Sequence, residues 1–181
     1  MYLISAYFDE NTNKILKHLQ QRIADKTGND FMIRNNVMPH LTISAIEARN
    51  VDVLIPAFEK VCREKLQPLD EKGVVNINNT INIVSVGQLF PRVIYAAPVL
   101  NEYMMNLSIS IYNEFATTNI SKFYQPYSWM PHITLGKCLD KEQMKQAFAV
   151  LQDLFMPIDG WIAKIGLSTV NPYREVLSVE L

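Results

Sequence analysis

The chain has few cysteines and no excess of charge of either sign. Its two cysteines, Cys62 and Cys138, lie outside any CxxC pair in a chain of 181 residues. A chain of this length needs no disulfide to stabilise its core, so we expect both to be reduced thiols. The formal net charge is −1. This argues against binding of long duplex nucleic acid, because such proteins carry a basic surface that displaces counterions.

Long hydrophobic runs and the common metal or nucleotide motifs are also missing. No stretch approaches the ~18 apolar residues of a membrane span. The first ten residues, MYLISAYFDE, lack the basic start and cleavage site of a signal peptide. We therefore expect a cytoplasmic protein that does not bind membranes. The sequence contains no HExxH, CxxC or glycine-rich phosphate loop, and we expect neither a metal nor an organic cofactor.

What remains is a globular composition, 49% hydrophobic and 19% charged. Hydrophobic spacing in the first half predicts the order β-α-β-α-β. The expected segments are strand 2–8, helix 11–26 closed by Gly28, strand 41–46, helix 53–66 with Pro56 in its first turn, and strand 74–86, either continuous or a hairpin broken near Asn78 and Asn79.

The same order restarts after Gly87. The expected segments are strand 92–97, a helix opened by Pro98, strand 132–136, a helix capped by Asp140 and Gln143, and strands 158–170 and 175–181 joined by a turn at Asn171 and Pro172. Residues 38–43, MPHLTI, return 92 residues later as residues 130–135, MPHITL. The opening strands match as well, with LISA at 3–6 and VIYA at 93–96.

The repeat predicts an α+β fold class. We expect one bilobal domain over residues 1–181, with halves 1–88 and 89–181. Each half would be a duplicated β-α-β-α-β unit, with two facing sheets around a central cleft and the helices outside. We expect the protein to be a monomer.

Two His-x-Thr motifs carry the chemistry. Because side chains alternate along a strand, His40 shares a face with Thr42, and His132 with Thr134. Histidine titrates near neutrality, so one imidazole can accept a proton while the other donates one. Each threonine hydroxyl can bind a phosphate oxygen. A lone histidine on a half-buried strand is usually structural, but two of three histidines at equivalent places of a repeat indicate a catalytic pair.

These motifs resemble those of the two-histidine (2H) phosphoesterase superfamily, the 2′-5′ RNA ligase and cyclic phosphodiesterase group. The resemblance covers essentially the whole chain and includes the segment FPRVIY at 90–95. It implies a bilobal α+β fold and metal-free catalysis. It implies as substrate a nucleotide or RNA end whose 2′,3′-cyclic phosphate is opened to the 2′-phosphate. It also implies that His132 activates water and that His40 protonates the departing 3′ oxygen.

Several alternatives stay open. Ligase-like members often have a basic residue at the position of Tyr2 and an arginine near the position of Lys137. The chain has neither, so the ligase direction is undecided. The substrate could also be a 2′-5′ linked oligonucleotide, an ADP-ribose cyclic phosphate, or two RNA ends joined without ATP. A non-catalytic module that binds a nucleotide or RNA end is the alternative from another class. The intact histidine and threonine of both motifs argue against it.

Other residues are candidate substrate contacts of lower specificity. Ser5 and Tyr95 occupy equivalent strand positions and can line the cleft. Cationic side chains near the second motif can bind phosphate, and aromatic side chains before it can stack on a base. Such cations are often ordinary surface residues, and such aromatics often belong to the core. These candidates are Arg92 and Lys137 among the cations, and Tyr124, Tyr127 and Trp129 among the aromatics. His18 lies on an amphipathic helix, and we expect it to be a solvated surface residue.

Overall fold

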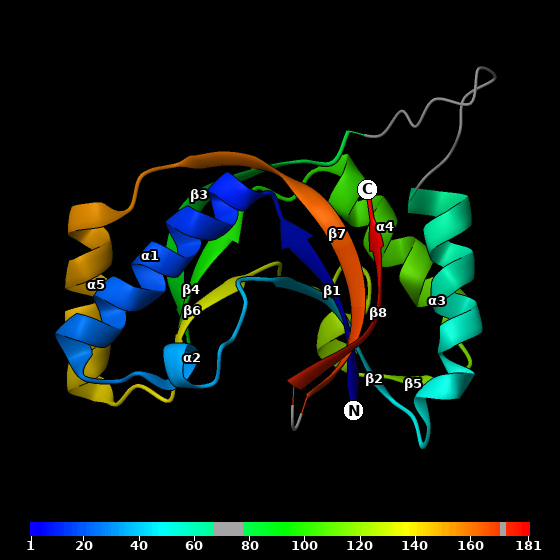
Figure 1. Ribbon diagram of the computed structural model, residues 1–181, viewed down its shortest axis with the longest axis horizontal. Coiled ribbons are helices and arrows are strands. Elements are labelled where there is room, and N and C mark those ends of the chain that lie inside the picture. Colours follow the sequence, from blue (N-terminus) through cyan, green and yellow to red (C-terminus); the bar gives the residue numbers. More distant parts are fainter. Residues whose placement is uncertain (67–77, 171–172) are drawn as a thin grey trace.

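The computed structural model describes residues 1–66, 78–170 and 173–181, and these form a mixed α+β structure (Figure 1). The strands are β1 (Tyr2–Phe8), β2 (Leu41–Glu47), β3 (Thr80–Leu89), β4 (Val93–Pro98), β5 (Asn119–Ile120), β6 (Ile133–Lys137), β7 (Ile158–Val170) and β8 (Tyr173–Glu180). The α-helices are α1 (Glu10–Thr27), α2 (Phe31–Arg34), α3 (Ile55–Val61), α4 (Glu102–Glu114) and α5 (Lys141–Leu154). The α+β class is therefore confirmed.

The described strands form one antiparallel sheet in place of the two facing sheets expected. Their order is β1-β2-β6-β4-β3-β7-β8, and β1 also pairs with β7. The long strand β7 closes this circuit, because its residues 158–161 pair with β3 and its later residues pair with β1 and β8. Figure 1 shows β7 arching over the molecule. Hydrogen bonding thus joins the two sides of the arch.

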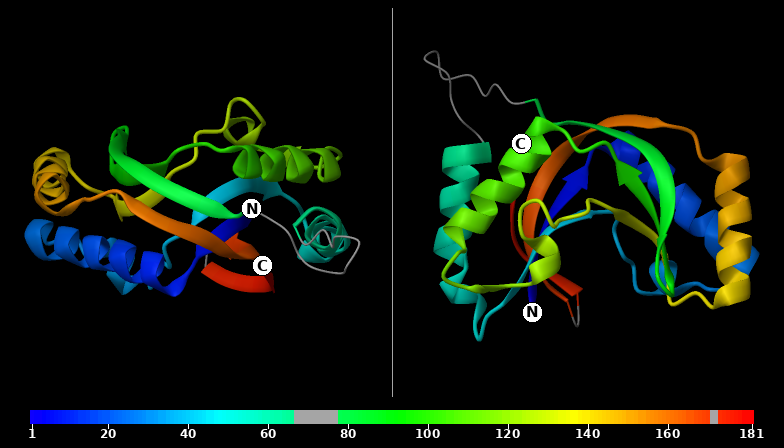
Figure 2. Two further views of the ribbon diagram at one scale, coloured as in Figure 1. Left: turned by 90° about the horizontal axis from the view of Figure 1, so that it is seen from above. Right: turned by 180° about the vertical axis from the view of Figure 1, so that it is seen from behind.

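The helices flank the arch as two pairs that mix the two halves of the sequence. α1 packs beside α5 on one side, and α3 beside α4 on the other (Figure 2). α1 also contacts β6, whereas α4 contacts β2. The helices and strands of both halves share one apolar core. Within the described ranges, none of the helices has the length and apolar character to span a bilayer.

Local signals explain most helix ends. The Asp9 carboxylate accepts the Thr12 N–H at 2.9 Å and begins α1, and Gly28, with φ 68°, ends it in the left-handed region. Asp140 and Gln143 form the expected capping box of α5. Pro56 lies in the first turn of α3, as predicted.

Two expectations for the middle of the chain need correction. Pro98 does not open a helix: it ends β4 opposite Ile83, and α4 begins after Asn101, whose side chain caps the Met104 N–H at 2.9 Å. β3 begins at Thr80 and continues unbroken to Leu89. Residues 74–77 of the expected strand lie outside the described residues. So does the predicted turn at 171–172.

Candidate active site

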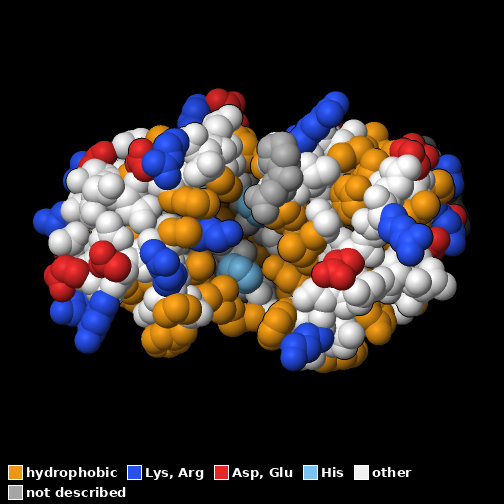
Figure 3. Space-filling model, turned by 90° about the horizontal axis from the view of Figure 1, so that it is seen from below, with side chains coloured by type: hydrophobic (Ala, Val, Ile, Leu, Met, Phe, Trp, Pro, Cys, Tyr) orange, Lys and Arg blue, Asp and Glu red, His pale blue; other side chains and the backbone are white. Residues whose placement is uncertain are grey.

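The two His-x-Thr motifs lie on neighbouring strands. β2 and β6 are antiparallel and pair at Leu41 and Ile133, the residues that directly follow the two histidines. Both of these apolar side chains are fully buried. In this register the histidines and threonines of both motifs fall on the opposite face of the strand pair. Figure 3 shows histidine side chains together in the hollow between the two sides of the molecule.

A β-bulge interrupts each motif strand at the same place. The register of β1 on β2 shifts at Ser5, which pairs with Thr42, and the register of β4 on β6 shifts at Tyr95, which pairs with Thr134. Ser5 and Tyr95 therefore do occupy equivalent positions. Bulges locally bend a strand and redirect its side chains, and they are common beside active sites.

Beside each bulge, a backbone carbonyl accepts a hydrogen bond from a buried side chain. The Trp129 indole N–H donates to the Thr42 carbonyl at 3.0 Å, and the Gln20 amide donates to the Thr134 carbonyl at 3.1 Å. Trp129 is only 7% exposed. The prediction that Trp129 stacks on a base therefore needs correction, because its ring lies in the core and its N–H holds β2. Sequence reasoning missed Gln20, which looks like any other polar residue of a helix.

Both imidazoles are oriented by the same hydrogen bond. His40 Nδ1 lies 2.7 Å from the Met38 carbonyl oxygen, and His132 Nδ1 lies 2.9 Å from the Met130 carbonyl oxygen. A carbonyl can only accept, so Nδ1 must be the nitrogen that donates. Nε2 of each ring is then the nitrogen available for proton transfer.

The surroundings of His40 favour its neutral form. Burial lowers the pKa of His40, the hydrogen bond to Met38 opposes this, and the positive charges of His132 and Lys137 lower the pKa further. Lys137 is exposed at the end of β6, and its ammonium lies 5.8 Å from the Phe31 ring centroid. Strict strand alternation would place its side chain on the other face, but the bulge between Thr134 and Gly136 shifts the alternation by one residue and returns Lys137 to the face of the histidines.

A tyrosine lies beside each histidine. The ring centroids of Tyr7 and His40 are 6.1 Å apart, and those of Tyr95 and His132 are 5.7 Å apart. The Tyr7 and Tyr173 hydroxyls form a hydrogen bond of 2.5 Å. Sequence reasoning proposed Tyr95 but missed Tyr7. Its position two residues after Ser5 on the same strand face was the available signal.

Each of these tyrosines lies across a glycine of a neighbouring strand. A Cβ on Gly166 of β7 would come within 2.9 Å of the Tyr7 ring. A Cβ on Gly87 of β3 would come within 2.6 Å of Tyr95 Cζ. The absence of a Cβ at these glycines therefore leaves the space that each tyrosine ring occupies beside its histidine.

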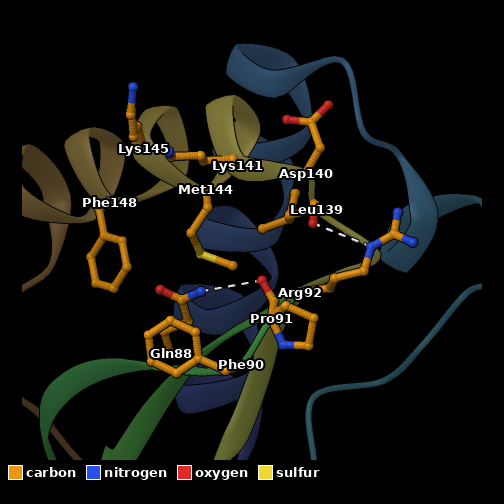
Figure 4. Close-up of a pocket in the computed structure, with 10 residues that line it drawn as sticks. All are labelled: Gln88, Phe90, Pro91, Arg92, Leu139, Asp140, Lys141, Met144, Lys145 and Phe148. Atoms are coloured by element: carbon orange, nitrogen blue, oxygen red, sulfur yellow. Dashed lines mark hydrogen bonds between the residues drawn. The ribbon is translucent and has the colours of Figure 1, made fainter.

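The structure does not bring Arg92 together with the motifs. Its guanidinium donates to the carbonyls of Cys138 at 2.9 Å and Leu139 at 3.3 Å. Arg92 lines a pocket beside α5 that neither histidine lines (Figure 4). Any phosphate contact of Arg92 is therefore away from the histidines.

The remaining candidates differ in their exposure. Ser5 is buried, and its hydroxyl has no hydrogen-bond partner in the part of the chain that the structure describes. Tyr127 is 84% exposed in a turn. Tyr124 is half-buried against the core. His18 is exposed on α1, as expected.

The histidine face of β2 and β6 thus carries two imidazoles with an available Nε2 and two threonines, with a tyrosine beside each histidine. Such a set can accept one proton, donate another and hydrogen-bond an anionic group. Among the described residues, no three His, Cys, Asp or Glu residues are grouped as a metal site requires. The chain matches no model of a known protein family and no curated protein sequence.

Proposed function

We propose that the protein is a metal-independent phosphoesterase that acts on a cyclic phosphate or phosphodiester of RNA ends or nucleotides, opening a 2′,3′-cyclic phosphate to the 2′-phosphate. The observation that carries the proposal is the matched hydrogen bonding of the two histidines. Each Nδ1 donates to the carbonyl two residues earlier, on strands that pair at Leu41 and Ile133. Two Nε2 atoms are then available to one phosphate.

The four motif side chains suffice for the reaction. One imidazole Nε2 accepts a proton from the water that attacks phosphorus, and the other donates a proton to the oxygen whose bond to phosphorus breaks. The hydroxyls of Thr42 and Thr134 donate to non-bridging oxygens as their negative charge grows. With the 5′-hydroxyl of a second RNA in place of water, the base would take its proton, the hydroxyl oxygen would attack phosphorus and the 3′ oxygen would leave with a proton from the acid, which joins two RNA ends by a 2′-5′ linkage without ATP.

The roles of the two histidines rest on the family resemblance, which makes His132 the base and His40 the acid. The lowered pKa of His40 in the free protein favours a neutral ring, which suits the opposite assignment. A phosphate anion between the rings favours the protonated form of either one. A comparison of leaving groups tests which ring donates the proton.

We also propose that the two halves of the chain are a duplicated unit of the 2H type. Three features occur once in each half and support this: the bulge at Ser5 or Tyr95, the histidine bonded to the carbonyl two residues earlier, and a tyrosine beside that histidine. Helix pairs that mix the halves are compatible with a duplication whose two units interlock.

The test is an assay in excess chelator with several 2′,3′-cyclic nucleotides and an RNA oligonucleotide ending in a cyclic phosphate. We expect turnover to survive chelation and the product to carry a 2′-phosphate. Loss of activity in chelator that zinc or manganese restores would contradict the mechanism. Tight binding of the nucleotide without any product would favour the non-catalytic module.

A further inference from the structure

A pocket of about 610 Å³ lies between the β3–β4 turn and α5. Its surface is largely apolar, and Phe90 at its edge is 86% exposed. Figure 4 shows Met144 and Phe148 of α5 facing Phe90 across the pocket, with Lys141 and Lys145 farther along the helix surface. A large aromatic side chain that is exposed at the mouth of an apolar pocket is typical of a binding site.

Cations extend from this pocket toward the histidines. Lys145 pairs with Glu142 at 3.0 Å, whereas no hydrogen bond or ion pair within the described ranges holds the Lys141 ammonium. The Arg92 side chain points from the pocket toward α2 (Figure 4), and Lys137 also reaches α2, at Phe31. The one acidic residue of the lining, Asp140, is engaged in capping α5.

Strand geometry gives the distance between the pocket and the histidines. Val93, next to Arg92, pairs with Lys137, four residues beyond Ile133 on β6. Because β6 has a bulge in between, the partner residues on β4, Val93 and Ala96, are only three apart, which is about 10 Å at the rise of a strand and places the pocket beyond the histidines themselves. The β3–β4 turn and the start of α5 lie where the arch is open (Figures 1 and 2). Histidine side chains are visible in the hollow from that same side (Figure 3).

We infer that this pocket is an accessory site for single-stranded RNA, in which a base stacks on Phe90 and the phosphates pass Lys141, Arg92 and Lys137 toward the histidines. The inference rests on the proposed function and narrows its substrate to an RNA strand that ends in a cyclic phosphate, rather than a free cyclic nucleotide. Aromatic side chains interleaved with cations bind single strands through stacking and charge, without reading the sequence.

Two substrates that share the reacting group test the inference: a 2′,3′-cyclic mononucleotide, and an RNA 10-mer that ends in the same cyclic phosphate. We expect Phe90→Ala and Lys141→Glu each to raise KM for the 10-mer about tenfold, the size of one lost stacking or phosphate contact. KM for the mononucleotide and kcat for both substrates should not change. The matched control is Phe123→Ala, which removes an aromatic that is 69% exposed and has the Lys122 ammonium 5.3 Å from its ring centroid. It should change neither KM.

Direct binding separates this inference from the proposed function, because it needs no turnover. Fluorescence anisotropy would follow a labelled RNA 10-mer that ends in a 3′-hydroxyl. We expect its affinity to fall about tenfold in Phe90→Ala. The slope of log Kd against log salt should be smaller in Lys141→Gln than in the wild type.

The outcomes are distinguishable. Reduced binding in these variants, in a protein that hydrolyses no cyclic phosphate, would support the accessory site and contradict the proposed function. Variants that bind and cleave the 10-mer as the wild type does would overturn the accessory site, even if mononucleotides are hydrolysed. In that case an acidic peptide with an aromatic anchor would be the better occupant of the pocket.

Discussion

The indole N–H of Trp129 donates to the carbonyl of Thr42, 87 residues earlier in the chain, at 3.0 Å. The reciprocal bond runs from Gln20 to the carbonyl of Thr134 at 3.1 Å. A buried side chain of each half thus holds the backbone beside the bulge of the other half. The geometry of either motif therefore depends on correct folding of both halves.

Trp129→Phe should lower the free energy of unfolding by about 1 to 3 kcal/mol, because a buried carbonyl loses its donor while most of the ring volume stays. Urea denaturation measures this difference. Tyr127→Phe is the control, since Tyr127 is 84% exposed, and its effect should stay within about 0.5 kcal/mol. Equal stability of the two variants would mean that the bond to Thr42 contributes nothing.

If the proposed function is right, replacing either motif histidine by alanine should lower kcat on a cyclic phosphate by about 10² to 10⁴, the usual contribution of a positioned acid or base. The double variant should lose much less than the product of the single losses, because the two residues act as a unit. A substrate with a better leaving group needs less help from an acid, so it should rescue His40→Ala more than His132→Ala. The opposite pattern of rescue would exchange the two roles.

Gly87→Ala should lower kcat by displacing Tyr95 from His132, since the new Cβ would come within 2.6 Å of the Tyr95 ring. The displacement of a side chain costs less than that of backbone, so the protein should remain folded by circular dichroism. In a Tyr95→Leu background the same glycine substitution should have little further effect on kcat, because the two residues act through one contact. Additive losses would show that Gly87 acts independently of Tyr95.

Stability should fall as the pH drops from 7 to 5, in part because of His40. Its pKa is lowered in the folded protein, so below about pH 6.5 the unfolded chain binds more protons than the folded one. His40→Gln should remove this part of the loss, as measured by urea denaturation at both pH values. His18→Gln, at an exposed position of α1, should keep the wild-type dependence. An unchanged dependence in His40→Gln would contradict the lowered pKa.

The parts of the fold that follow from local patterns were predictable from the sequence. Strand β1 at Tyr2–Phe8, strand β7 at Ile158–Val170 and the capping box of α5 agree with the expectation, because periodicity and capping involve residues close in the chain. The two His-x-Thr motifs were found through the repeat. They were expected to meet across a cleft between two facing sheets, whereas the structure places them on neighbouring strands of one sheet.

Features that depend on distant partners were not predictable. The single sheet arises because β7 changes partner along its length, and no spacing within β7 indicates this. Tyr7 can lie beside His40 only because Gly166, on a distant strand, has no Cβ that would meet its ring. Trp129 is buried with its N–H bonded to the Thr42 carbonyl, which the bulge leaves available. An aromatic residue before a strand has the same local appearance whether it stacks on a ligand or packs in the core.

The closed circuit of strands has a consequence for synthesis of the protein. β1 is synthesised well before β7, yet it lies between β2 and β7, with Tyr2 opposite Thr169 and Phe8 opposite Ile162. β3 also needs β7 on one side. Until β7 emerges, a nascent chain has two unpaired strand edges, which are prone to associate with other chains. A chaperone that shields β1 and β3 until β7 has been synthesised should therefore raise the yield of folded protein.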